Sequence, residues 1–253
     1  KKKRGFYAPY TPVNATVFRL YALFAPEYSQ TLPATARIRS ESRESFARKP
    51  GADTQLSWEE VDKSLIDEAK VFHFGTLSLT DEPARTATQK AIAYAKAQGK
   101  LITCDPNLRK PLWHSLEEAK EQLLWGLKQA DVVKISDEEV EFLFGLEVEE
   151  GARYILDTFG MKLVFVTCGA DGCYFCNPVA CGHVPGLNGI KVVDTTAAGD
   201  TFSAAMTIEY LRSADIKAAV RYGAAAAAIT VSRSGASSSV PTREEVERFI
   251  QRG

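Results

Sequence analysis

A turn of small residues, residues 194–200 (DTTAAGD), has the residue types and spacing for phosphate chemistry. It follows an apolar run at residues 190–193 and opens an apolar-periodic stretch at residues 201–211, which predicts a strand, a turn and a helix in succession. The first N–H groups of a helix have no internal acceptor, and small side chains let an anion approach them closely. Asp200 would repel an anion, yet it could take a proton from a hydroxyl group that then attacks a bound phosphoryl group. The alternative is that Asp200 only caps the helix.

Polar residues also follow three other predicted strands, and the carboxyl ends of parallel strands meet at one edge of a sheet. The candidates are Asp105, Asn107 and Arg109 after residues 101–104, Ser136 to Glu139 after residues 131–135, and Thr167, Gly169 and Gly172 around the end of residues 162–167. Each group has a structural alternative, namely a turn closed by Asp105, a helix cap at Ser136 and a glycine hairpin. Their convergence with Asp200 favours a functional site.

The elements that would position these residues alternate along the chain from Asp62 onward. We predict strands at residues 70–74, 101–104, 131–135 and 162–167, and helices at residues 82–98, 115–130, 137–144 and 149–159. Such alternation is typical of a parallel sheet with helices on both faces. Residues 173–193 predict an antiparallel margin on this sheet, and residues 216–231 and 242–251 predict two more helices, the last one capped by Thr242.

The composition excludes several classes of protein. The 253 residues include 31 basic and 32 acidic side chains, so no basic excess points to nucleic acid. A basic run at residues 1–4 is not followed by the apolar core of a signal peptide, and no apolar stretch reaches membrane-spanning length. We therefore expect a cytoplasmic protein without nucleic-acid or membrane partners, in which the five cysteines are reduced.

Four of these cysteines lie close together, at positions 168, 173, 176 and 181. The spacing of Cys173 and Cys176 matches that of zinc ligands, and the other two could complete a four-thiolate site. A strand would however point Cys173 and Cys176 to opposite faces. We therefore favour small core side chains over a zinc-binding module.

The motifs together resemble those of the PfkB-type, ribokinase-like carbohydrate kinases, and among these the fructokinases most of all. The family signature Asp-Thr-x-Gly-Ala-Gly-Asp matches residues 194–200, with Ala197 at the first glycine. Further matches lie, in order, at residues 49–53, 73–78, 105–113, 134–139, 166–172 and 223–241. The resemblance covers about residue 30 to the end. The family's first strand with its acidic sugar ligand, and its Gly-Gly-…-Asn motif, are not found in this sequence.

This resemblance implies an α/β protein with the three-layer αβα ribokinase-like fold, in which a central, mostly parallel sheet carries a small β lid. Residues 1–60 would be an incomplete N-terminal part that includes the lid ribbon at about residues 34–48, where the sequence alternates loosely. Residues 61–253 would form the αβα domain that binds nucleotide and sugar. The family resemblance also makes a homodimer through the lid a candidate assembly.

The resemblance implies a role for each site residue. Asp200 would be the catalytic base, and the backbone N–H groups of Ala197, Ala198, Gly199 and Asp200 would form the anion hole. Glu139 would hold Mg²⁺ through water, although Ser136 replaces the asparagine of the family's Asn-x-x-Glu motif. The remaining roles would be ATP phosphate contacts at Thr167, Gly169 and Gly172, adenine contacts at Ala225, Ala228, Gly235 and Ser239, and sugar-side contacts at Arg48, Asn107 and Arg109.

The activity implied is the transfer of the γ-phosphate of ATP to a primary hydroxyl group of a small sugar, with fructose favoured. The cofactors expected are ATP and Mg²⁺, with K⁺ as a further candidate cation. One alternative is a 2-keto-3-deoxygluconate kinase, since Arg48 and Arg109 could equally serve the carboxylate of a sugar acid. A ribokinase is another alternative. From another class, a noncatalytic kinase-like binding or regulatory protein is an alternative that the unmatched sugar motif favours and Asp200 opposes.

Overall fold

A computed structural model describes residues 51–252 of the chain. These residues form two compact units. Residues 51–168 and 174–182 make up the first, called the sheet unit here, and residues 169–173 and 183–252 make up the second, called the helical unit. The expected lid ribbon at residues 34–48 and the predicted sugar contact Arg48 lie outside the described residues. The expected division at residue 60 stays a prediction.

The sheet contains β1 (Val71–Gly75), β2 (Leu101–Asp105), β3 (Val132–Ser136), β4 (Leu163–Thr167), β5 (Gly172–Cys176) and β6 (Cys181–Pro185), in that order across the sheet. The strands β1 to β4 are parallel. The helices of the sheet unit are α2 (Lys63–Glu68), α3 (Ala84–Ala97), α4 (Leu116–Gln129), α5 (Asp137–Phe144) and α6 (Val148–Phe159). The predicted strands and helices of this region are confirmed to within two residues at each end. The helix α2 was not predicted.

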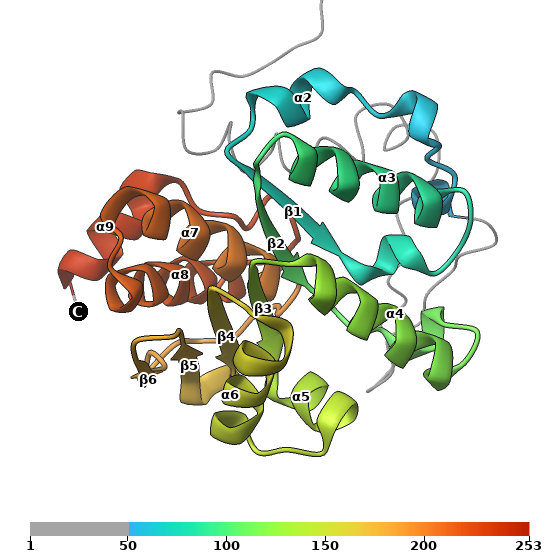
Figure 1. The fold of residues 1–253 in the computed structure, drawn as a ribbon. Coiled ribbons are helices and arrows are strands. Elements are labelled where there is room, and N and C mark those ends of the chain that lie inside the picture. The colour runs from blue at the N-terminus through green and yellow to red at the C-terminus, as the bar shows by residue number, and fades with distance from the viewer. Residues whose placement is uncertain (1–50, 253) are drawn as a thin grey trace, which may run out of the picture. The chain divides into compact units, whose positions relative to one another are not determined.

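The two faces of the parallel strands differ in chemistry. Because strand order follows chain order and such crossovers share one hand, α3 to α6 fall on one face (Figure 1). Alternate strand residues pack with these helices into one buried core, which includes Phe72, Phe74, Ile102, Cys104, Val133, Ile135, Val164 and Val166. The opposite face carries His73, Thr103, Asp105 and Lys134. Polar groups are therefore gathered on one face of the sheet and excluded from the other.

The helical unit contains α7 (Ala198–Ser213), α8 (Ile216–Val231) and α9 (Arg243–Arg252). Small residues let α7 and α8 approach closely, since a Cβ added at Gly223 would lie 2.9 Å from the Met206 Cβ. The predicted cap of the last helix is confirmed. Thr242 N–H donates to Glu245 Oε2 at 2.8 Å, and Glu245 N–H donates to the Thr242 hydroxyl at 3.3 Å.

The strand predicted at residues 190–193 is wrong. The segment is irregular, with Val192 60% and Val193 43% exposed. The backbone N–H groups of Val193 and Asp194 donate to the Val231 carbonyl at 2.7 and 3.1 Å. An apolar, β-branched run predicts a strand, but here its donors bind the carboxyl end of α8 instead of a neighbouring strand.

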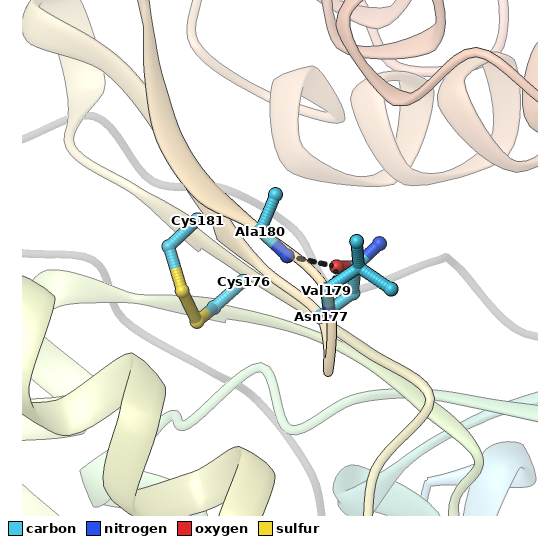
Figure 2. The surroundings of a disulfide bond; sticks show 5 residues. All are labelled: Cys176, Asn177, Val179, Ala180 and Cys181. Atoms are coloured by element: carbon cyan, nitrogen blue, oxygen red, sulfur yellow. Dashed lines mark hydrogen bonds between the residues drawn. A yellow bond between two sulfur atoms is a disulfide. The ribbon is translucent and has the colours of Figure 1, made fainter.

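The β5–β6 hairpin holds a disulfide between Cys176 and Cys181 (Figure 2). Its turn is closed by Asn177, whose side-chain oxygen accepts from the N–H groups of Val179 and Ala180 at 2.9 and 2.7 Å. The expectation that all five cysteines are reduced is therefore wrong for these two, because the turn brings them side by side. Two of the four ligands of the zinc alternative are bonded to each other, and residues 51–252 hold no cluster of three or more side chains that could bind a metal directly.

The three other cysteines, Cys104, Cys168 and Cys173, are thiols outside this disulfide. Burial raises the pKa of Cys104 well above its usual value, which suits a small side chain in the core. Among the described helices, none has the length and apolar character needed to cross a bilayer.

The contact between α5 and α6 gives a direct test of the core. A Cβ at Gly151 of α6 would lie 2.2 Å from Val140 Cγ1, and Val140 is fully buried and stiff. We expect Gly151→Ala to lower the free energy of unfolding by about 1–3 kcal/mol. At Gly126 of α4 the nearest atom is 3.3 Å away, so Gly126→Ala should stay within about 1 kcal/mol of the parent. Urea titration measures both, and equal effects would contradict this packing.

Candidate functional site

The turn before α7 in the helical unit has the backbone that an anion site needs. Ala197 is the N-cap of α7 and adopts a left-handed conformation, with φ 64° and ψ 10°. The helix begins at Ala198, and its first internal bond runs from Thr201 N–H to the Ala197 carbonyl at 2.9 Å. The Ala198 N–H donates back to the Thr195 carbonyl at 3.2 Å, so this member of the predicted anion hole is bonded within the turn. Half-buried Asp200 lies in the first turn of α7, so the helix begins three residues before the predicted start, and Ala197 is the N-cap in place of Asp200.

Asp194 joins this turn to the loop after α8. Its carboxylate accepts from the Thr196 N–H at 3.0 Å and the Thr196 hydroxyl at 2.7 Å. Its other oxygen accepts from the Gly235 N–H at 3.3 Å. The structure thus brings the phosphate turn together with Gly235, a predicted adenine contact. Asp194 itself is a structural residue that the sequence analysis missed, since nothing in the sequence pairs it with a residue so far along the chain.

The other predicted adenine contacts are buried. Ala225 is 1% exposed within the core of the helical unit, and Ala228 is 8% exposed. Ser239 is fully buried, and its hydroxyl donates to the Ala236 carbonyl at 2.6 Å. Small size at these positions serves the packing of α8 and the following loop, and their role toward adenine stays a prediction.

The two predicted phosphate glycines have different local reasons to be glycine. Gly172, with φ 105°, leaves no room for a side chain, because a Cβ there would lie 2.2 Å from the Val184 carbonyl oxygen. Gly169, with φ 54°, faces open space and is exposed. The hairpin alternative therefore explains Gly172, whereas Gly169 leaves its backbone accessible to a ligand.

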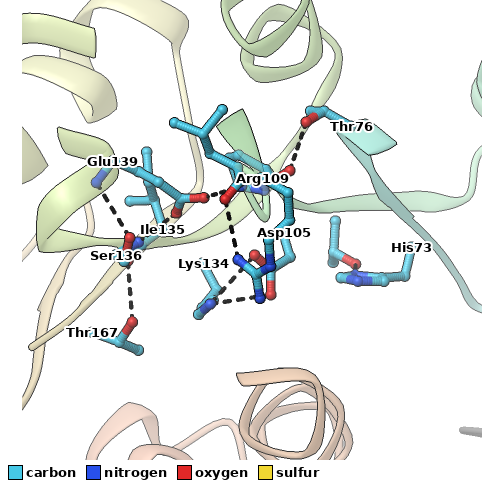
Figure 3. A network of polar contacts seen from close by, with 12 residues as sticks. His73, Thr76, Asp105, Arg109, Lys134, Ile135, Ser136, Glu139 and Thr167 are labelled. Atoms are coloured by element: carbon cyan, nitrogen blue, oxygen red, sulfur yellow. Dashed lines mark hydrogen bonds and ion pairs between the residues drawn. The ribbon is translucent and has the colours of Figure 1, made fainter. Parts of the chain in front are cut away.

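The sheet unit carries the second group of predicted residues, at the ends of β2 and β3 (Figure 3). Asp105 ends β2 and forms an ion pair with Lys134 of β3 at 3.2 Å, with the two side chains 5% and 12% exposed. The Asp105 carboxylate therefore binds a side chain of the neighbouring strand, and the alternative in which it closes a turn stays a prediction. The next residue, Pro106, accepts at its carbonyl from the Thr76 hydroxyl at 2.6 Å and the Thr76 N–H at 3.3 Å.

Glu139 lies in the first turn of α5 and is 6% exposed. One carboxylate oxygen accepts from the Leu108 N–H at 2.6 Å, and the other from the Ser136 N–H at 2.8 Å. The Ser136 hydroxyl accepts from the Glu139 N–H at 3.2 Å, so the helix-cap alternative at Ser136 is confirmed. Each carboxylate oxygen retains acceptor capacity, so a water molecule bound to a cation could still donate to Glu139, and the role toward Mg²⁺ stays a prediction.

The structure brings Asn107, Arg109, Glu139 and Thr167 of the prediction to neighbouring strand ends. Asn107 has φ 52°, and Arg109 donates from Nη1 to the Leu108 carbonyl at 3.1 Å. Thr167 is the register partner of Ser136 and donates to the Ile135 carbonyl at 3.4 Å. Thr76 and Lys134, which hold this edge together, were not predicted as site residues.

Comparisons with known proteins agree with these motifs. Residues 24–243 match the family described as pfkB family carbohydrate kinase. The chain belongs to this family. Fructokinase-2 of Solanum lycopersicum is 39% identical over 227 residues, which are 87% of this chain and 69% of that protein. Fructokinase-1 of Zea mays is 39% identical over 226 residues, or 86% and 70% of the two chains.

Solved structures show the fold of this pfkB kinase. A fructokinase from Vibrio cholerae, with fructose, ADP and calcium bound, has a TM-score of 0.72 at 30% identity and covers 81% of this chain and 68% of its own. A fructokinase from Xylella fastidiosa with bound ATP has a TM-score of 0.75 at 28% identity, over 84% and 71%. The predicted three-layer α/β, ribokinase-like fold is confirmed. The protein is a phosphotransferase with an alcohol group as acceptor.

The left-handed alanine in the phosphate turn leads to a stability prediction. A left-handed conformation costs a residue with a Cβ about 1–2 kcal/mol, offset in glycine by about 0.5–1 kcal/mol of backbone entropy. We therefore expect Ala197→Gly to raise the free energy of unfolding by up to about 1 kcal/mol. The neighbouring change Ala198→Gly, inside the helix, should lower it by about 0.5–1 kcal/mol. Thermal and urea unfolding measure the change in the free energy of unfolding for both variants. A change of the same sign in both would contradict the left-handed conformation of Ala197.

Proposed function

We propose that this kinase transfers the γ-phosphate of ATP to a primary hydroxyl group of fructose. The observation that carries the proposal is Asp200 in the first turn of α7, directly after the left-handed Ala197. There a carboxylate stands beside the N–H groups of a helix start, so a proton acceptor and donors for negative charge occur together. The fructokinases among the relatives support fructose as the acceptor.

In the proposed reaction Asp200 accepts the hydroxyl proton while the sugar oxygen bonds to the γ-phosphorus and the bond to ADP breaks. The backbone N–H groups of Ala197, Gly199 and Asp200 would stabilise negative charge on the transferred group, whereas that of Ala198, also predicted, is bonded within the turn. Mg²⁺, when bound, neutralises charge on the phosphates, and Glu139 would hold it through water. Asn107 and Arg109 would contact the sugar side. Thr167, Gly169 and Gly172 would flank the phosphates, and Ala225, Ala228, Gly235 and Ser239 the adenine.

Further parts of the proposal concern cations and cellular context. K⁺ is a candidate second cation, supported by a fructokinase variant from Vibrio cholerae whose structure contains fructose, ADP and potassium ion. A cytoplasmic location, and a homodimer that pairs through the lid, both stay predictions.

The catalytic role of Asp200 can be separated from folding by a matched pair of variants. We expect Asp200→Asn to lower kcat by about a hundredfold to ten-thousandfold, because an amide cannot accept the proton. Binding of ATP, measured by calorimetry, should stay within a few-fold. The control is Asp215→Asn, since Asp215 caps α8 in the same unit and asparagine caps a helix equally well. Near-normal turnover of Asp200→Asn would rule out this residue as the base.

The acceptor is tested by ADP release across fructose, ribose and 2-keto-3-deoxygluconate. We expect the highest kcat/KM with fructose. Arg109, exposed at the end of β2, could instead bind the carboxylate of a sugar acid, and a preference for 2-keto-3-deoxygluconate would show this. No sugar-dependent ADP release with any of the three would favour the noncatalytic alternative, which the unmatched Gly-Gly-…-Asn motif suggests.

A further inference from the structure

The pairing between β2 and β3 ends early at the edge that carries the site. Their ladder contains two residue pairs, Thr103 with Val132 and Cys104 with Val133, whereas β1–β2 and β3–β4 contain five pairs each. At the opposite edge the two strands are closely joined, since Asp131 N–H donates to the Ile102 carbonyl at 2.8 Å. The pairing therefore begins at the start of β3 and ends at Cys104 and Val133, just before Pro106, which has no N–H to continue it. Backbone groups beyond the last pair need other partners.

Beyond the last paired residues, side chains connect β2 and the loop after it to β3 and α5. The Asp105–Lys134 ion pair connects the strand ends, and the Glu139 carboxylate connects the first turn of α5 to the Leu108 N–H (Figure 3). From the other side, Thr76 binds the Pro106 carbonyl twice. The residues on either side of Asn107 are therefore both fixed, and Asn107 lies between them in a left-handed conformation.

We propose that Glu139 is a positioning residue, whose carboxylate holds residues 105–109 in place through the Leu108 N–H and thereby fixes Asn107 and Arg109 at the site edge. The inference rests on the proposed function in so far as Asn107 and Arg109 are taken to contact the sugar side. It goes beyond a role toward Mg²⁺, because the bond to Leu108 exists in the protein alone.

The chemistry at this position requires a carboxylate of this length. Two backbone donors, Leu108 N–H and Ser136 N–H, approach the two oxygens separately. Glutamine has a single acceptor oxygen and would turn its NH₂ group toward one of these donors. Aspartate is shorter by one methylene group. The Leu108 side chain packs against the core of the sheet unit, which helps to fix the position of its amide beside the carboxylate.

Amide hydrogen exchange by NMR, in the protein without sugar or nucleotide, tests the Glu139–Leu108 hydrogen bond independently of any substrate. In the parent protein we expect the Leu108 amide to exchange more slowly than that of its exposed neighbour Arg109. In Glu139→Gln it should exchange about tenfold to a hundredfold faster, as expected for loss of a hydrogen bond to a charged group. The control is Glu138→Gln, which removes an exposed charge from the same helical turn and should leave the rate unchanged.

A Leu108 amide that exchanges rapidly in the parent protein would overturn the proposal without any variant. The proposal therefore stays testable even if Glu139→Gln fails to fold. An unchanged Leu108 rate in a folded Glu139→Gln would overturn it equally. Failure of the fructose assay alone would reject the proposed function and leave the exchange result intact.

Kinetics then separate positioning from a metal role. At saturating Mg²⁺ we expect Glu139→Gln to lower kcat/KM for fructose about tenfold or more, because the loop lacks its hydrogen bond even when the metal site is filled. In the background of Asn107→Gly, which keeps the left-handed backbone and removes the side chain, the Glu139→Gln effect should shrink. Recovery of the parent kcat/KM in Glu139→Gln at saturating Mg²⁺, or full additivity with Asn107→Gly, would confine the carboxylate to the metal role and contradict the positioning role.

Discussion

Carboxylates bind backbone N–H groups that have no partner within a strand or helix because they lie near its end. The site regions of both units depend on this interaction. In the helical unit Asp194 binds the N–H groups of Thr196 and Gly235. In the sheet unit Glu139 binds those of Leu108 and Ser136. A buried N–H without a partner is costly, and a charged acceptor makes a stronger bond than a neutral one. The acidic residues near the site therefore build its loops as well as offering charge to ligands.

The same acidic residues stabilise loops and are candidate site residues, so a structural interpretation of such a residue does not exclude a functional one. Ser136 and Glu139 form an ordinary capping box, yet the same carboxylate reaches across to the loop after β2. Gly172 is required by the hairpin, while Gly169, at the other end of the same short turn, faces open space. A helix cap or a tight turn is thus compatible with a site, because both occur where the backbone is exposed at the end of an element.

The order and type of the elements in residues 51–252 followed from the sequence because hydrophobic periodicity is a local property. The helix predicted at residues 82–98 is α3 (Ala84–Ala97), and the helix predicted at residues 216–231 is α8. The strand predicted at residues 190–193 was wrong because an apolar run indicates a tendency to form a strand but does not show whether a neighbouring strand is available. The signature with Asp200, and its resemblance to a carbohydrate kinase family, could be recognised from spacing alone.

The contacts that hold the site were beyond sequence reasoning. Asp105 and Lys134 belong to different strands, and only the register of the sheet brings them together. Pro106, which has no N–H, is a sign in the sequence that the pairing of β2 with β3 ends early, but nothing in either strand indicates that Glu139 binds the following loop. The Cys176–Cys181 bond depends on the turn that places the two thiols opposite each other. The left-handed backbone at Ala197 had one signal in the sequence, the glycine that the family signature has at that position.

The most direct measurement is a crystal structure of the protein with fructose and a non-hydrolysable ATP analogue. The account predicts a primary hydroxyl oxygen of the sugar within hydrogen-bond distance of the Asp200 carboxylate, roughly 2.6–3.2 Å, and in line with the γ-phosphate. A sugar whose hydroxyl groups all lie beyond the reach of Asp200, or whose phosphate-facing hydroxyl contacts another base, would contradict it.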